Sequence, residues 1–410
     1  MESTRLWAGK EDAEDPLAAF RAEFALPDGV IQLNGNSLGP LPRAVPEALD
    51  AVVRRQWGGH LIRGWFDDGW FDAPERVGDR IGRLIGAGPG QTVVGESTSV
   101  QLFNAVAAAA RLRPDRRVLV CDAANFPTDR YLAASVARVL GLRLVECTAG
   151  ELAAVLQAHR GEVGPVLFGA VDFRTGELLD LAGTTARIHA AGGVAVWDLS
   201  HAAGAVPVEV DAAGVDLAVG CGYKYLNGGP GAPAYLYAAT RHQAALDLPI
   251  TGWHGHARPF EMAGTFEPAD GITRARTGTP QILSLLALEA ALDPLERAGV
   301  AAVRAKSLRL GDYLAALIRE LPDGVRPEVV TPTEHHRRGG HVALRCPDAP
   351  AVSAALMERG VFTDARPPDL LRLCLNGLYV SYTDVFDAVT AFAEVAAAAG
   401  SGKRSAEGER

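Results

Sequence analysis

Short apolar runs alternate with helical patterns between about residues 90 and 240. The runs are rich in valine and leucine and lack the alternation of apolar and polar residues that a half-exposed strand shows; they cover residues 118–121, 142–147, 166–171, 194–197 and 217–221. Each run therefore predicts a strand that is covered on both faces. Stretches between them, such as 100–111 and 131–140, repeat apolar residues at helical spacing. This order predicts an α/β domain with a mostly parallel sheet flanked by helices.

The pattern changes near residue 280. Two helical stretches come first and two strand-like runs follow, with further helices between and after them, at residues 282–297, 303–320, 341–345 and 370–375. This mixture predicts a smaller α+β domain at the C-terminal end. We therefore expect four parts, namely an N-terminal arm that packs with the small domain, a large domain, the small domain and a disordered tail, at residues 1–45, 46–285, 286–398 and 399–410.

The composition argues against several classes of protein. Apolar residues make up 48% of the 410 residues and charged residues 22%, as in a soluble protein of two or three domains. The net charge of -9 argues against nucleic-acid binding, which needs basic patches. No apolar stretch reaches membrane-spanning length and the first residues lack the apolar core of a secretory signal, so we expect a cytoplasmic protein. The five cysteines are scattered, without a Cys-x-x-Cys pair, so neither a disulfide framework nor a metal site is expected.

Polar and aromatic residues gather directly after the predicted strands. Ligands of open parallel sheets bind beyond the carboxyl ends of the strands. In this chain those positions hold the segments 125–129 (Asn-Phe-Pro-Thr-Asp), 172–176 (Asp-Phe-Arg-Thr-Gly), 198–201 (Asp-Leu-Ser-His) and 222–231 (Gly-Tyr-Lys-Tyr-Leu-Asn-Gly-Gly-Pro-Gly). We therefore expect one functional site at this edge of the sheet.

Asp198 and Lys224 form the most informative pair. A carboxylate at the end of a buried strand needs a cationic partner, and a lysine one strand later meets that need. The pair fits a structural ion pair. It fits equally well the binding of pyridoxal phosphate (PLP), which a lysine holds as a Schiff base while an aspartate pairs with the pyridine nitrogen.

Three neighbouring features fit either interpretation. His201 is a candidate partner of Asp198, and Phe126 is a candidate to stack on a cofactor ring, although each residue type is more often structural. The helix that begins after Ser97 offers hydroxyl and free N–H groups to a phosphate, yet such residues are commonly helix caps.

The segment 222–231 resembles the lysine segment of the kynureninase family, PLP enzymes of fold type I and aminotransferase class V. Five further segments match that family in the same order: 33–39 (Leu-Asn-Gly-Asn-Ser-Leu-Gly), 125–129, 174–176, 198–202 and 252–256 (Gly-Trp-His-Gly-His). The matches extend from about residue 30 to residue 385. The resemblance implies PLP fold type I, with a seven-stranded, mostly parallel sheet in the large domain and a smaller α+β C-terminal domain.

The resemblance also implies roles for individual residues. Lys224 holds the cofactor and acts in catalysis with Tyr223, and the cofactor-binding residues are Thr98, Ser99, Phe126, Asp129, Asp198, His201, Tyr223, Lys224, Trp253 and Thr279. Trp253 and Thr279 resemble residues that reach the cofactor from a neighbouring subunit, which implies a homodimer with shared active sites. The substrate-binding residues are Trp65, His254, Asn36 and Arg372. Arg372 matches the arginine that binds the substrate α-carboxylate, a task suited to its planar fork.

Three positions depart from the family pattern or vary within it. Gly169 stands where the family often has a hydroxyl residue near the phosphate, so some phosphate contact is expected to shift elsewhere. His254 occupies a position that other members fill differently, for example with an aromatic residue. Trp65 occupies a position that alternates between aromatic residues and histidine. Because Trp65 and His254 concern the aryl end of the substrate, the preferred ring substituent stays open.

The implied reaction is the hydrolytic Cβ–Cγ cleavage of L-kynurenine, or of a ring-substituted relative such as 3-hydroxykynurenine, to an anthranilate and L-alanine. The sequence leaves open whether the pathway is tryptophan breakdown, as on the route to NAD, or the supply of an anthranilate.

Two alternatives remain beside this reaction. A desulfurase-like lyase needs a nucleophilic cysteine on a mobile loop, whereas Cys346 and Cys374 fall at or inside strand-like runs. Desulfurases also usually carry histidine before the lysine, where this chain has Tyr223. A non-catalytic PLP-fold binding protein would need a degraded site, whereas the implied lysine, aspartate and arginine are all present.

Overall fold

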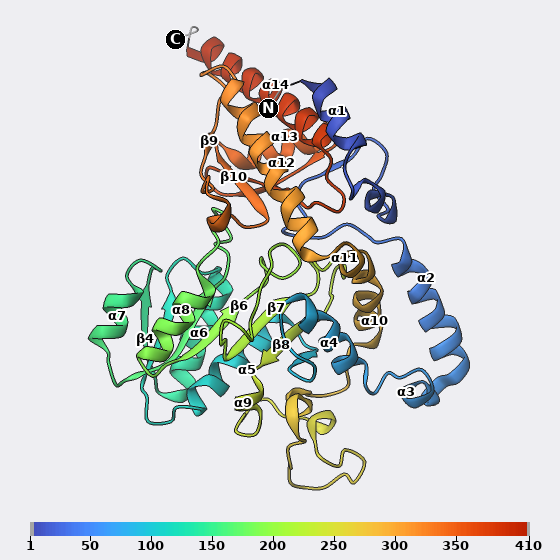
Figure 1. The fold of residues 1–410 in the computed structure, drawn as a ribbon, viewed down its shortest axis with the longest axis vertical. Coiled ribbons are helices and arrows are strands. Elements are labelled where there is room, and N and C mark those ends of the chain that lie inside the picture. Colours follow the sequence, from blue (N-terminus) through green and yellow to red (C-terminus); the bar gives the residue numbers. More distant parts are fainter. Residues whose placement is uncertain (1–3, 408–410) are drawn as a thin grey trace. The chain divides into compact units, whose positions relative to one another are not determined.

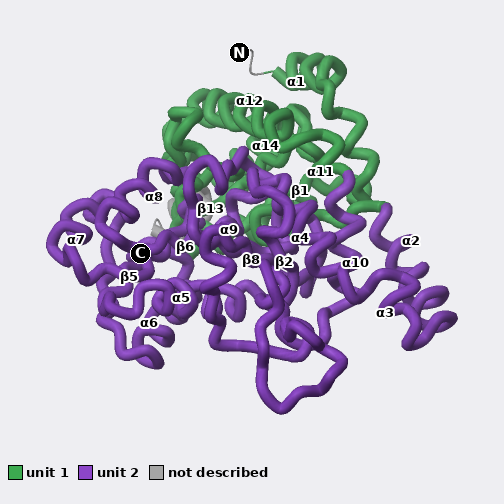
Figure 2. Tube along the Cα trace, turned by 60° about the horizontal axis from the view of Figure 1, so that its bottom comes forward, with its two compact units in different colours: residues 1–43, 174–177, 294–410 green, residues 44–173, 178–293 purple. Residues whose placement is uncertain are grey.

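The chain divides into two units, coloured separately in Figure 2. The computed structural model describes the backbone of residues 4–407 and the side chains through residue 398. The large unit comprises Ala44–Phe173 and Leu178–Asp293, and the small unit comprises Met1–Arg43, Arg174–Glu177 and Pro294–Arg410.

The large unit contains a seven-stranded sheet in the order β2-β8-β7-β6-β5-β3-β4. Its strands are β2 (Thr92–Val94), β3 (Val118–Asp122), β4 (Arg143–Cys147), β5 (Val163–Gly169), β6 (Val194–Asp198), β7 (Leu217–Cys221) and β8 (Ala234–Ala238). Five neighbouring strands pair in parallel, namely β7, β6, β5, β3 and β4. Strand β8 is antiparallel to both β7 and β2. This mostly parallel α/β sheet confirms the expected fold class.

One expectation about the strands was wrong in part. Residues 142–147 were expected to form a strand covered on both faces, but β4 is the edge strand of the sheet, and its Arg143 and Glu146 are exposed. Arg130 forms an ion pair with Glu146 at 2.7 Å, and Arg143 pairs with Glu162 at 2.6 Å. Such charged side chains are the usual protection of an exposed strand edge.

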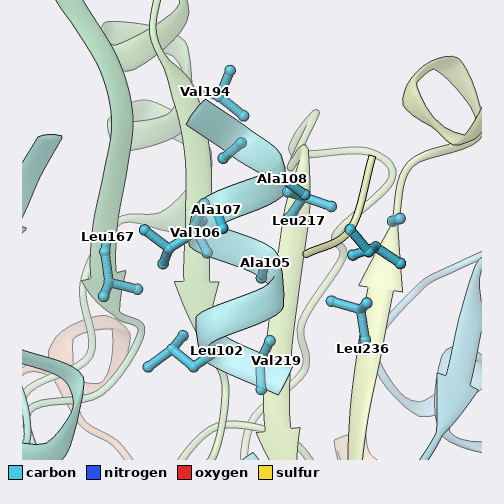
Figure 3. Close-up of a cluster of buried hydrophobic side chains, with 14 of the residues drawn as sticks. Leu102, Ala105, Val106, Ala107, Ala108, Leu167, Val194, Leu217, Val219 and Leu236 are labelled. Carbon is cyan, nitrogen blue, oxygen red and sulfur yellow. The ribbon is translucent and has the colours of Figure 1, made fainter. Parts of the chain in front are cut away.

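Helix α5 (Thr98–Arg111) packs across the middle of the sheet. Ser97 caps it by accepting a hydrogen bond from the N–H of Val100 at 3.4 Å. Small alanine side chains let its axis approach the strands closely, and Figure 3 shows its residues against side chains of β5, β6, β7 and β8, among them Leu102, Ala105, Val106, Leu167, Val194, Leu217, Val219 and Leu236. This apolar layer fixes the strand ends that carry the polar residues described below.

The remaining helices of the large unit surround this core. They are α2 (Ala44–Ala51), α3 (Gly64–Asp67), α4 (Ala73–Leu84), α6 (Pro127–Leu140), α7 (Leu152–Ala158), α8 (Leu181–Ala190), α9 (Thr240–Gln243) and α10 (Ile282–Ala291). A π-helical turn (Val52–His60) and short 3-10 turns (Leu61–Arg63, Trp253–Gly255 and Gly271–Ala275) complete the unit. Helix α10 contacts α2 and α4, and the large unit ends at Asp293, whereas the domain boundary expected from the sequence was residue 285.

The small unit contains a four-stranded antiparallel sheet in the order β12-β13-β10-β9 and a two-stranded parallel pair of β1 with β11. The strands are β1 (Ile31–Gln32), β9 (Glu328–Val329), β10 (His341–Arg345), β11 (Val361–Phe362), β12 (Asp364–Arg366) and β13 (Leu370–Cys374). The helices are α1 (Arg5–Ala13), α12 (Val300–Glu320), α13 (Ala349–Met357) and α14 (Tyr382–Glu407), with α11 (Asp293–Ala298) at the boundary and 3-10 turns at Ala18–Glu23 and His335–Arg337.

The N-terminal segment is fastened to the small unit by polar contacts. Helices α1, α12 and α14 lie side by side (Figure 1). Asp12 accepts hydrogen bonds from the N–H groups of Tyr382 and Thr383 at 2.6 and 3.0 Å, and so caps α14. Asp15 forms a buried ion pair with Lys306 at 2.6 Å. Helix α14 continues to Glu407, so the tail expected at 399–410 begins inside a helix, and its last three residues lie outside the described part.

None of the described helices has both the length and the apolarity needed to cross a membrane. Within the described residues, histidine, cysteine, aspartate and glutamate side chains nowhere gather in threes in a way that would hold a metal ion.

Candidate active site

The polar segments after β3, β6 and β7 all lie at one edge of the large sheet. These strands and β5 run parallel, so their carboxyl ends share that edge. Asp198 is the last residue of β6 and pairs across the ladder with Val219 of β7 and Gly169 of β5. Lys224 follows the end of β7 by three residues.

Lys224 is the centre of this group. Its Nζ lies 3.1 Å from Nε2 of His201, a histidine that is only 7% exposed. The rings of Phe126 and Tyr223 lie 6.0 and 5.8 Å from the same nitrogen, which is within cation–π range. The structure therefore brings together the amine, the histidine and both aromatic rings that the sequence singled out.

Asp198 and Asp129 form a pair of carboxyl groups beside this lysine. Asp198 accepts a hydrogen bond from the N–H of Ser200 at 2.8 Å. Asp129 lies in the first turn of α6, is 4% exposed, and hydrogen-bonds with Asp198. Burial, followed by the charge of Asp198, raises the pKa of Asp129 well above its usual range, and Lys224 only partly opposes this. The raised pKa keeps Asp129 protonated at neutral pH.

The large unit also holds the predicted positions Thr98, Ser99, Tyr223 and Gly169. Thr98 and Ser99 are half-buried in the first turn of α5, where helix N–H groups favour an anion. Burial, together with the neighbouring Cys221 and Asp198, raises the pKa of Tyr223, so its phenol stays protonated at neutral pH. Gly169 offers only backbone, and its N–H donates to Asn125 Oδ1 at 2.7 Å.

The donor set of the large unit fits PLP. A lysine amine suits an aldehyde, a charged aspartate suits a protonated pyridine nitrogen, and a helix N-terminus with hydroxyl residues suits a phosphate. In addition, Asp129 Oδ2 is buried and has no hydrogen-bond partner within the described part of the chain. A buried polar atom without a partner is expected where a bound group completes the site.

An aromatic cluster of the large unit holds Trp65, Trp253 and His254. The ring of Trp65 lies 6.2 Å from that of Trp253 and 6.5 Å from that of His254, and Trp253 stacks on His254 at 5.0 Å. Trp253 Nε1 donates to Thr279 Oγ1 at 3.4 Å. His254 is 1% exposed, and burial lowers its pKa, so the ring is neutral at neutral pH.

Arg276 is a member of this cluster that the sequence reasoning missed. Its Nη1 lies 3.1 Å from His254 Nε2 and donates to the carbonyl oxygen of Phe71 at 3.0 Å. Burial lowers the pKa of Arg276 to about 10, which leaves the guanidinium charged and opposes protonation of His254. Arg276 directly follows the 3-10 turn Gly271–Ala275, and an arginine at such a position gives no sequence pattern that reveals this contact.

The small unit holds the remaining candidates, Asn36 and Arg372. Arg372 of β13 is fully buried, and its Nη2 donates to Ser37 Oγ at 3.1 Å. With the Asn36 amide oxygen turned toward it, Arg372 also donates from Nε and Nη2 to Asn36 at 3.2 Å each. An ion pair joins Arg372 to Asp364, which stands directly opposite on β12.

The cysteines have the properties of core residues. Cys346 is 5% exposed and Cys374 is fully buried. Burial raises the pKa of Cys346 to about 11, so its thiol is protonated at neutral pH. Neither position supplies the exposed thiolate that a desulfurase needs.

Comparisons with known proteins agree with these observations. Residues 303–392 match the family model described as the kynureninase C-terminal domain. The chain is 49% identical over 389 residues to a kynureninase of Deinococcus radiodurans, with 94% of each chain covered. It is 42% identical over 392 residues to a kynureninase of Pseudomonas fluorescens, with 94% of this chain and 93% of the relative covered.

Solved structures of other PLP-fold proteins share the architecture. An apo cysteine desulfurase from Thermococcus onnurineus superposes with a TM-score of 0.78 at 17% identity and covers 93% of this chain and 98% of its own. A mutant of C-DES with glycine linked covalently to its PLP cofactor superposes with a TM-score of 0.79 at 17% identity and covers 91% and 99%. At such identities the likeness supports the fold alone.

Proposed function

The chain belongs to the kynureninase family, and from that premise we propose that it hydrolyses L-kynurenine, or a ring-substituted relative such as 3-hydroxykynurenine, to an anthranilate and L-alanine. It is a PLP-dependent hydrolase of a carbon–carbon bond. The observation that carries the assignment to specific residues is the cluster in which Lys224 Nζ lies 3.1 Å from His201, beside the carboxyl pair Asp198 and Asp129.

The residues that would hold PLP are those of the sheet edge. Lys224 would bind it covalently, Asp198 would pair with the pyridine nitrogen, His201 and Phe126 would contact the ring, and Thr98, Ser99 and Tyr223 would bind the phosphate. When bound, PLP supplies an electron sink for the charge that develops on the substrate carbons. Asp129, because it is protonated, donates a hydrogen bond to Asp198 and keeps that carboxyl group in a fixed orientation.

Proton transfer is the work of two residues. The Lys224 amine moves the proton of the substrate Cα, and His201 keeps Nζ in position. Tyr223 retains its phenol proton at neutral pH and donates it to Cβ, which keeps the electron pair of the broken Cβ–Cγ bond. Water supplies a hydroxyl group to Cγ, which becomes the carboxyl group of the anthranilate, and the remaining proton of water restores the phenol, so that substrate plus water balance anthranilate plus alanine.

Recognition of the amino-acid substrate is divided between its two ends. Arg372 binds the α-carboxylate, with Asn36 beside it. Trp65 and His254 bind the aryl ring. The stacked rings of Trp253 and His254 and the edge of Trp65 support this assignment, since aromatic groups pack well in such arrangements.

We also propose a cytoplasmic homodimer in which Trp253 and Thr279 reach the neighbouring subunit's cofactor. Large apolar side chains are exposed on two segments of the large unit, around residues 53–66 and 260–266, and include Trp57 at 57%, Ile62 at 76%, Phe66 at 66% and Met262 at 77% exposure. An apolar surface of this kind supports burial against a second copy. The cysteines, all buried and free, support a reducing compartment.

The test is a paired turnover assay of the PLP-loaded enzyme with L-kynurenine and 3-hydroxy-L-kynurenine. Anthranilate products are followed by fluorescence and L-alanine by chromatography. Turnover of either substrate is the expected result, and the ratio of the two kcat/KM values in wild type, Trp65→His and His254→Phe reports the ring preference. Absence of both products from a protein that shows the absorbance of bound PLP would refute the proposed reaction.

A further inference from the structure

Two arginines share one carboxylate in the sheet of the small unit. Strand β12 runs antiparallel to β13, with Asp364 opposite Arg372 and Arg366 opposite Leu370. Side chains two residues apart on a strand point to the same face, so Asp364 and Arg366 share a face with the cross-strand neighbour Arg372. We call Asp364, Arg366 and Arg372 the arginine–carboxylate cluster.

The two oxygens of Asp364 are divided between the arginines. Arg366 Nη1 donates to Oδ1 at 2.6 Å and to the carbonyl oxygen of Ala365 at 3.0 Å. Arg372 Nη2 pairs with Oδ2, to which Ser37 Oγ also donates. The Asp364 side chain is only 10% exposed and that of Arg366 30% exposed, so water screens these charges incompletely.

Charge balance gives Arg366 its importance. Arg372 and Asp364 alone form a neutral pair, and a neutral pair attracts an incoming carboxylate weakly. With Arg366 the cluster carries one net positive charge. The two arginines act on each other electrostatically. Burial, followed by the charge of Arg372, lowers the pKa of Arg366, and Asp364 opposes both effects.

We propose that Arg366 is a positioning residue for carboxylate recognition, which neutralises Asp364 and thereby leaves the charge of Arg372 to the α-carboxylate of the amino-acid substrate. The inference rests on the proposed function, in which Arg372 binds that carboxylate. It assigns to Arg366 an electrostatic role that a packing residue would not have.

The test uses the net charge of the cluster as its variable, in the PLP-loaded enzyme. Arg366→Gln removes the net charge, and we expect the KM for L-kynurenine to rise about tenfold while kcat stays within about twofold. The double variant Arg366→Gln/Asp364→Asn restores one net positive charge, and its KM is expected to return to within about threefold of wild type. Arg366→Lys keeps the charge and is expected to resemble wild type.

A matched control comes from the neighbouring strand β10. Arg345 is 48% exposed and pairs with Glu328 and Asp369, outside the cluster, so Arg345→Gln is expected to leave KM unchanged. A second readout is the absorbance change of bound PLP on titration with L-alanine and with L-alaninamide. Arg366→Gln is expected to weaken the binding of L-alanine about tenfold and to leave the binding of L-alaninamide, which has no carboxylate, unchanged.

The outcomes separate the two proposals. An unchanged KM and unchanged L-alanine affinity in Arg366→Gln would overturn the inference, as would a loss that the double variant fails to rescue. Failure of the wild-type enzyme to cleave kynurenine would instead refute the proposed function, and the titrations with L-alanine and its amide would still decide the role of Arg366.

Discussion

Asp216 is the most heavily bonded carboxylate of the large unit, and its replacement by asparagine gives a quantitative prediction. It precedes β7, and its side chain is 5% exposed. It accepts hydrogen bonds from the N–H of Ala195 at 2.7 Å, His189 at 2.8 Å, His242 at 2.7 Å and Arg241 at 2.6 Å. The carboxylate therefore ties α8, α9 and the starts of β6 and β7 together.

The magnitude follows from these contacts. An amide keeps one acceptor oxygen, so about two of the hydrogen bonds lose their acceptor, and its NH2 group faces other donors. At about 1.5 kcal/mol for each bond to a charged group, Asp216→Asn is expected to lower the free energy of unfolding by about 3 kcal/mol. Because the Arg241 side chain is 46% exposed, water can solvate it once its partner is lost. The loss in the free energy of unfolding therefore stays near the lower end of the range for a broken buried ion pair.

The pH dependence of this loss has a definite sign. Burial alone would raise the pKa of Asp216, but hydrogen bonds from His242, Ala195, His189 and Arg241 hold it well below its usual range. A lowered folded-state pKa contributes stability that is complete above the ordinary value of about 4 and is lost as the pH falls through the folded-state value. The difference between wild type and variant is thus expected to be complete at about pH 5 and to shrink as the pH falls below about 4.

The assay is urea unfolding followed by tryptophan fluorescence, since Trp197 of β6 is fully buried and pairs with Ala218 of β7, two residues after Asp216. Asp247→Asn is the control, because Asp247 is 68% exposed and pairs only with Arg111 at 3.0 Å among the contacts described. The control is expected to change the free energy of unfolding by less than about 0.5 kcal/mol. A change equally small in Asp216→Asn would refute the reasoning.

Three further predictions concern single side chains. Because the raised pKa of Asp129 keeps it protonated at neutral pH, Asp129→Asn is expected to retain kcat/KM within about tenfold of wild type, whereas Asp129→Ala loses more; equal losses in steady-state assays would contradict this. Lys306→Met leaves the buried Asp15 unpaired and is expected to cost about 3 kcal/mol in urea unfolding, most of which Asp15→Asn recovers in the double variant. Gly176→Ala is expected to lower the thermal midpoint by several degrees, because φ is +75° and the new Cβ would lie 2.5 Å from the carbonyl oxygen of His341; an unchanged midpoint would show that the turn relaxes.

Much of the large unit was predictable because its strands are buried on both faces and read as continuous apolar runs. The strands that escaped, β2 and β8, pair antiparallel at one end of the sheet. Strand β2 has only three residues, and β8 follows β7 without a helix between them, so it breaks the alternation of strand and helix that located the other strands. The position of strand β4 was predicted correctly, but its burial was not. Its charged residues Arg143 and Glu146 can be recognised as protection of a sheet edge only once the strand order is known.

The site residues that could be predicted are those that lie at or directly after the end of a parallel strand. Asp198 and Lys224 lie after neighbouring parallel strands, so topology alone brings them to one edge. Asp364 and Arg366 were missed because their contact with Arg372 depends on the cross-strand register, which no local pattern reveals. The protonation of Asp129 was likewise missed, since it follows from burial beside a second carboxylate.

The central claim is that Lys224 binds PLP and carries kynurenine hydrolysis. The lysines of the chain are Lys10, Lys224, Lys306 and Lys403, so borohydride reduction of the PLP-loaded enzyme, followed by peptide mapping, gives an unambiguous location. We predict a pyridoxyl label on the peptide that contains Lys224, no label on the other lysines, and no turnover of L-kynurenine by Lys224→Ala. A label on another lysine, or a Lys224→Ala enzyme that still forms anthranilate and L-alanine, would contradict the claim.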